Sequence, residues 1–151
     1  MNALDFLTRE HREQENFLEE MAKAPDRKTR LAWYEKFREE LIKHVSMEEK
    51  IFYPRLKKIS GLEDKVLEAL EEHNLIMQLL QELDAGAEEK IWKAKLKVLQ
   101  ELTEHHVREE EEKLFCLVKE LASDHYLQEM GQQMKIHKKN TDPEKVLYPE
   151  H

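Results

Sequence analysis

Apolar residues recur at alternating three- and four-residue steps along four segments of this 151-residue chain. That spacing places side chains on one face of an α-helix. The segments are bounded by Pro25, by Ser60-Gly61 and by Ala85-Gly86-Ala87. They predict helices over residues 3–24, 26–59, 62–84 and 88–121, with Asp26 as an N-cap and a kink at Pro54 in the second.

Four long helices joined by short breaks predict an all-α, up-down-up-down four-helix bundle, in which consecutive helices are antiparallel neighbours. Ser123 or Asp124 can cap a shorter additional C-terminal helix that ends near Lys139 and packs on the bundle. No segment has the alternation of a strand. We expect one helical bundle domain over residues 1–140 and a polar C-terminal tail over residues 141–151, on the surface or disordered.

The formal net charge is −8. Nucleic acids and anionic membrane surfaces attract an excess of Lys and Arg, so we expect neither as a partner. No stretch approaches the ~20 apolar residues of a membrane span, and the N-terminus lacks a signal-peptide core, which favours a cytoplasmic protein. The one cysteine, Cys116, lies among apolar residues and is expected to be a buried free thiol.

Each long helix has a histidine near the middle of its apolar stripe. These are His11, His44, His73 and His106, and the periodicity selects His106 rather than its neighbour His105. A single inward histidine is an ordinary core residue. Four at matched depth in one core indicate a shared task.

Two of these histidines are followed four residues later by an inward glutamate, Glu48 after His44 and Glu110 after His106. Side chains four apart on a helix lie on one face, about 6 Å apart. A buried carboxylate is costly unless it is paired or coordinated. The six residues together therefore predict a buried dinuclear metal centre.

Imidazole and carboxylate donors suit iron, manganese, cobalt or zinc, and the absence of thiolates argues against a structural zinc finger. The alternative reading is a metal-free helical interaction module. In that case, replacing His73 or His106 by Leu would leave stability unchanged or raise it.

The order of single His, His-x-x-x-Glu, single His, His-x-x-x-Glu resembles the hemerythrin-like, or HHE cation-binding, family. The resemblance runs from about Leu4 to Leu121 and is strongest over residues 44–54 and 105–116, which look like two halves of an internal duplication. It implies two iron ions with an oxo or hydroxo bridge, with manganese or zinc as alternatives. Oxygen-carrying members have a five-residue step to the second carboxylate, which would make it Glu111 instead of Glu110.

One position departs from the oxygen carriers. They have a further histidine one turn after the third-helix ligand, where this chain has Met77, which we expect to be a packing residue. The six predicted ligands leave roughly two positions open on a pair of six-coordinate ions, where a fifth histidine would leave about one. Tyr34 or a neighbouring glutamate is a candidate for closing the site.

Three functions fit such a centre. The first is a non-heme diiron protein that binds or senses dioxygen, nitric oxide or peroxide, with a redox partner. The second is iron storage, delivery or sensing. The third is a diiron redox enzyme acting on peroxide or dioxygen, for which the sequence offers no identifiable catalytic residue or substrate pocket.

Overall fold

The computed structural model describes residues 1–150, and within that range every regular element is helical. The chain divides into two compact units, Met1–Phe52 with Ser123–His151 and Tyr53–Ala122. His151, the last residue of the predicted tail, lies outside the described residues. No helix in the described part of the chain is long and apolar enough to cross a membrane.

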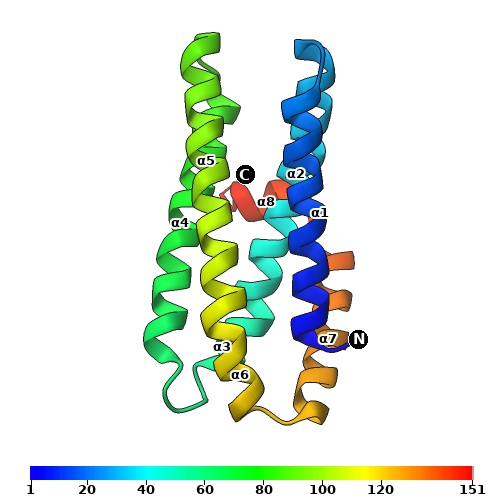
Figure 1. The fold of residues 1–151 in the computed structure, drawn as a ribbon, viewed down its shortest axis with the longest axis vertical. Coiled ribbons are helices and arrows are strands. Elements are labelled where there is room, and N and C mark those ends of the chain that lie inside the picture. Colours follow the sequence, from blue (N-terminus) through cyan, green and yellow to red (C-terminus); the bar gives the residue numbers. More distant parts are fainter. Residues whose placement is uncertain (151) are drawn as a thin grey trace. The chain divides into compact units, whose positions relative to one another are not determined.

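The first unit is built on the helical hairpin of α1 (Ala3–Lys23) and α2 (Arg27–Met47), blue to cyan in Figure 1. The hairpin turns at the predicted break. Asp26 is the N-cap of α2, as predicted, since its side chain accepts a hydrogen bond from the Thr29 N–H. Asn2 caps α1 in the same way.

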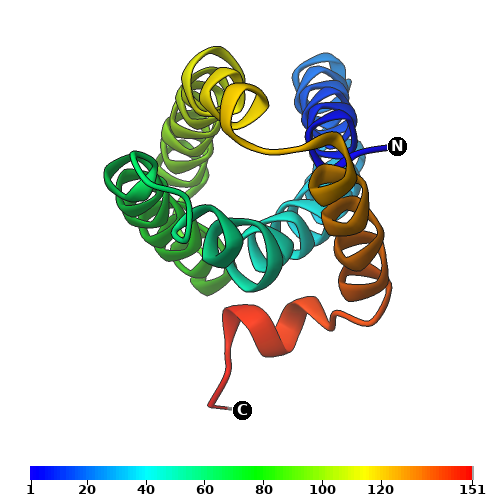
Figure 2. The same cartoon turned by 90° about the horizontal axis from the view of Figure 1, so that it is seen from below.

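Helix α7 (Asp124–Lys139) follows the N-cap Ser123, one of the two predicted caps, and packs along α1 (Figure 2). The two backbones meet at Gly131, where a Cβ atom would lie 2.8 Å from the carbonyl oxygen of Met1 and 3.0 Å from the nitrogen of Ala3. Only glycine allows this approach.

A further short helix, α8 (Pro143–Leu147), lies within the segment expected to be a polar tail. It packs on α2: Leu147 is buried, and Arg38 of α2 forms an ion pair with Glu144 at 2.5 Å. A single apolar side chain with a long-range ion pair is too small a pattern to predict docking from sequence.

The second unit contains α3 (Tyr53–Leu56), α4 (Glu63–Ala85), α5 (Glu89–Glu109) and α6 (Phe115–Leu121). Helices α4 and α5 form its hairpin, green to yellow in Figure 1. Gly86 ends α4 with φ +83°, a conformation that glycine adopts without strain.

Each hairpin contains a π-helical segment that begins at the glutamate of its His-x-x-x-Glu pair. These are η1 (Glu48–Phe52) after α2 and η2 (Glu110–Leu114) after α5. A π turn contains an extra residue, so the buried face moves along the sequence by about one position. The η2 segment explains one wrong prediction: Cys116, expected to be buried, is exposed, whereas Val118 two positions later is buried.

The two hairpins bury corresponding residues that lie 62 positions apart, as residue 44 does from residue 106. The internal duplication expected from the two His-x-x-x-Glu stretches therefore extends through both apolar stripes. Buried pairs at this spacing are Leu4 and Val66, Leu7 and Ala69, Leu18 and Leu80, Phe37 and Leu99, and Val45 and Val107.

Candidate metal centre

All six predicted ligands are buried, each with at most 4% of its surface exposed. His105 faces outward with 53% of its side chain exposed, so the choice of His106 as the inward residue is confirmed. Glu110 is buried and Glu111 only half-buried, which makes Glu110 the carboxylate of the core. Three of the six lie in each unit.

The first unit brings together His11 of α1, His44 of α2 and Glu48 of η1. One nitrogen of each imidazole and one oxygen of the carboxylate lie within 4.8 Å of one another. Nε2 of His44 is 3.2 Å from Glu48, one turn along the same helix. This triad offers two nitrogens and a carboxylate at distances that one cation could span.

The charge state of His44 depends on its two carboxylate neighbours. Burial alone would lower the pKa of the imidazole, but the charge of Glu48 and the hydrogen bonds to Glu10 and Glu48 outweigh burial and raise the pKa to about 10. Without a metal, His44 is therefore a cation at neutral pH. A metal at Nε2 would replace the proton there.

Glu10 was not predicted from the sequence, although it precedes His11. It is buried, and its Oε1 accepts a hydrogen bond from Nδ1 of His44 at 2.9 Å. Burial raises the pKa of Glu10, but the hydrogen bonds and charges of His44 and Lys138 together hold it below the usual value.

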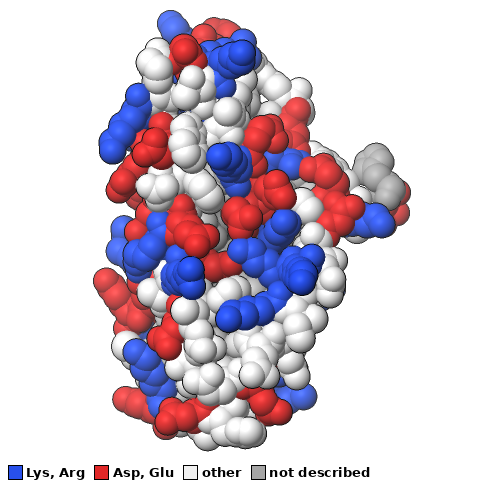
Figure 3. Space-filling model, turned by 90° about the vertical axis from the view of Figure 1, so that its right-hand side faces the viewer, with Lys and Arg blue, Asp and Glu red and all other residues white. Residues whose placement is uncertain are grey.

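Lys138 of α7 donates a hydrogen bond to Glu10 and forms an ion pair with Glu40 at 2.8 Å. It lies in a hollow of about 410 Å³ lined mainly by cationic side chains, among them Lys43, Lys135 and Lys139. Figure 3 shows Lys and Arg gathered beside acidic residues on this side of the first unit.

The second unit brings together His73 of α4, His106 of α5 and Glu110 of η2. The Nε2 atoms of the two histidines are 3.1 Å apart, and Nε2 of His106 is 3.4 Å from Glu110. This triad has the same composition as that of the first unit. Its three donors also converge.

The phenol of Tyr53 belongs to this second triad. It donates a hydrogen bond to Glu110 and lies 3.4 Å from Nε2 of both His73 and His106. The sequence pattern indicated Tyr34 for such a role and not Tyr53, because Tyr53 follows a π turn that a 3.6-residue periodicity does not predict. Tyr34 is buried within the first unit.

Met77, where oxygen carriers have a further histidine, is half-buried. The neighbouring Ile76 occupies the buried position on that turn of α4, with 1% exposed. Met77 therefore lies at the edge of the core, and its role as a packing residue stays a prediction.

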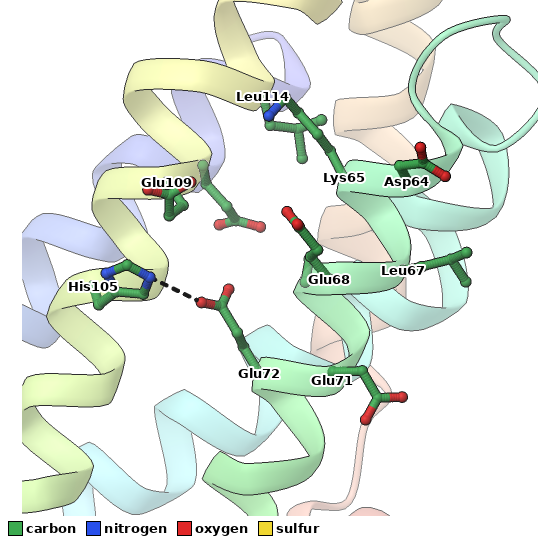
Figure 4. A pocket seen from close by; sticks show the side chains of 11 residues that line it. Asp64, Lys65, Leu67, Glu68, Glu71, Glu72, His105, Glu109 and Leu114 are labelled. Carbon is green, nitrogen blue, oxygen red and sulfur yellow. Dashed lines mark ion pairs between the residues drawn. The ribbon is translucent and has the colours of Figure 1, made fainter.

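Glu72 accepts a hydrogen bond from Nδ1 of His106 at 2.7 Å, and its other oxygen is 3.4 Å from Nε2 of His105. It lines a pocket of about 760 Å³ between α4 and the helix of α5 and η2. In Figure 4, Glu68 and Glu72 point from α4 toward His105 and Glu109. The pocket's acidic lining residues are Asp64, Glu68, Glu71, Glu72, Glu109 and Glu110.

The residues present fit a resident metal. Each triad places a carboxylate and two imidazoles together in a buried environment, where the carboxylate charge needs a cation. Each His-x-x-x-Glu histidine has its Nε2 toward the triad and its Nδ1 on an outer carboxylate, the arrangement usual for metal-bound histidine.

Comparison with known proteins agrees with this chemistry. The family model described as "Hemerythrin HHE cation binding domain" matches residues 2–118. The crystal structure of a hemerythrin HHE cation-binding domain-containing protein from Mycobacterium kansasii superimposes with a TM-score of 0.80 at 21% identity, covering 97% of each chain. This match confirms the predicted all-α bundle fold. A comparison with curated proteins finds no match.

Proposed function

Because the chain belongs to the hemerythrin HHE cation-binding domain family, we propose that it binds two iron ions through the two triads and binds or senses dioxygen, nitric oxide or peroxide there. The observation that carries the proposal is the burial of two triads of identical composition. They are His11, His44 and Glu48, and His73, His106 and Glu110.

Bound iron would supply coordination positions at which a diatomic ligand or peroxide can bind and exchange electrons. The chain's own residues have three tasks. The imidazoles provide neutral nitrogen donors, Glu48 and Glu110 balance the cationic charge, and the surrounding apolar side chains exclude water.

Tyr53 adds an oxygen to the second triad. It can hold Glu110 in place by its hydrogen bond or occupy one of the positions that the six ligands leave open. In the second role Tyr53 would leave the site less open than the six predicted ligands alone.

The test is optical. Anaerobic addition of dioxygen or nitric oxide to the ferrous protein should change its visible spectrum. The double variant His73→Ala/His106→Ala should lose the response, whereas His105→Ala, which changes an exposed neighbour, should keep it. A wild-type spectrum unchanged by both gases would overturn ligand binding as the function.

The acidic pocket favours a second candidate function, reversible iron loading for storage, delivery or sensing. Its wall includes Glu110 and also Glu72, which contacts His106, so solvent reaches the outer side of the second triad. Rapid loss of iron to a weak chelator would support this role. Retention of iron through prolonged dialysis would count against it, and metal analysis would distinguish iron from manganese or zinc.

A further inference from the structure

The residue before the single histidine of each hairpin is a glutamate, and in both units it contacts the other hairpin helix. Glu10 lies 2.9 Å from Nδ1 of His44, and Glu72 lies 2.7 Å from Nδ1 of His106. Glu10 and Glu72 are separated by 62 positions, the same spacing that separates each proposed ligand of the first triad from its counterpart in the second. The contact is therefore a repeated part of the site.

Each contact orients an imidazole. A carboxylate on Nδ1 holds the proton there and leaves Nε2 for a metal. In both rings Nε2 does face the triad, toward Glu48 at 3.2 Å and toward Glu110 at 3.4 Å.

The two outer carboxylates differ in their surroundings. Glu10 has 6% of its side chain exposed, and its second oxygen accepts a hydrogen bond from Lys138, which also pairs with Glu40. The side chain of Glu72 is 20% exposed and lines the acidic pocket. Its second oxygen lies 3.4 Å from Nε2 of the exposed His105.

We propose that Glu10 and Glu72 are positioning residues of unequal strength, and that the ion at the triad of His73, His106 and Glu110 therefore exchanges faster than the other. The inference rests on the proposed function. Lys138, which restrains Glu10, lies beyond residues 2–118, which the family model matches.

The experiment follows release of iron from the fully loaded protein to a chelator in excess. Wild type should lose its two ions in two phases of equal amplitude. Glu72→Ala should accelerate the fast phase by roughly 10–100-fold, and Lys138→Met should accelerate the slow phase, because outer partners of metal-bound histidines affect metal affinity by this factor.

Matched controls come from the same two pockets. Glu71→Ala and Lys139→Met change exposed neighbours that line the same hollows and should leave both phases unchanged. Glu72→Gln, whose amide oxygen can still accept from Nδ1, should restore most of the wild-type rate. Circular dichroism and denaturation of each variant show whether it folds. If Glu72→Ala does not fold, Glu72→Gln still tests the role of the Glu72 carboxylate.

Two outcomes would overturn the inference while leaving the proposed function intact. One is a single release phase from a wild-type protein that holds two ions. The other is acceleration of the same phase by Glu72→Ala and Lys138→Met. A wild-type protein that takes up no metal would instead overturn the proposed function, and the inference with it.

Discussion

The phenol of Tyr53 donates a hydrogen bond to the carboxylate of Glu110, and both side chains are almost completely buried. A hydrogen bond to a buried charged group contributes more to stability than a neutral one, because the charge has little other solvation. Tyr53 thus stabilises the second triad before any metal binds.

Tyr53→Phe should therefore lower the free energy of unfolding of the metal-free protein by about 1.5–3 kcal/mol. Urea denaturation of the metal-free variant measures this directly. Tyr126→Phe, which changes a half-buried phenol of α7, is the control and should have a much smaller effect. Equal stability of Tyr53→Phe and wild type would show that the hydrogen bond is not formed.

Gly131→Ala has two opposing effects on stability, a gain from helix propensity and a loss from the close approach of α7 to the N-terminal backbone. Alanine in a helix interior is normally more stable than glycine by roughly 0.5–1 kcal/mol. Here the new Cβ would meet the backbone of Met1 and Ala3, so we expect a net loss of stability. Thermal unfolding should show a lower Tm for Gly131→Ala than for wild type. Gln132→Ala, which changes an exposed neighbour, is the control and should not lower the Tm. A raised Tm for Gly131→Ala would contradict the close approach of the two backbones.

Leu147→Ala tests whether α8 is part of the folded first unit. Leu147 is 2% exposed, and truncating a buried leucine costs about 2–5 kcal/mol. We expect a loss in that range by denaturation, with Lys145→Ala close to wild type. A neutral Leu147→Ala would mean that the segment is a surface tail, as the sequence suggested.

The stability of the metal-free protein and its affinity for metal should change in opposite directions as pH rises. In the metal-free protein the pKa of His44 is raised from 6.5 to about 10, so its stabilising contribution is complete below pH 6.5 and is lost as pH rises toward 10. Metal must displace the Nε2 proton, so metal affinity should rise over the same range and fall as histidines protonate in acid.

Thermal unfolding of the metal-free protein at about pH 7 and about pH 9.5 measures the loss of stability with rising pH. The difference between the two pH values should be smaller in His44→Gln. Calorimetry in buffers of different ionisation enthalpy measures the pH dependence of metal binding, because proton release on metal binding adds buffer heat. Metal binding without proton release would show that His44 is already neutral.

The sequence predicted the helices and the six inward residues because both depend on local periodicity. The end of α1, the N-cap Asp26 and the selection of His106 over His105 follow from single-turn patterns. Such patterns need no knowledge of distant contacts.

The missed features depend on long-range contacts or on the π turns. Periodicity of 3.6 residues cannot anticipate the extra residue in η1 and η2, so Tyr53 was overlooked and Cys116 was placed in the core. Glu10 was not predicted because its partners, His44 and Lys138, lie 34 and 128 residues away.

Elemental analysis of protein purified from an iron-replete host tests most directly whether the two triads hold two metal ions. We predict two iron atoms per chain in wild type, with a loss of iron and of stability in His106→Leu but not in His105→Leu. Less than one metal atom per chain in wild type, with His106→Leu as stable as wild type or more stable, would contradict the account and identify a metal-free helical module.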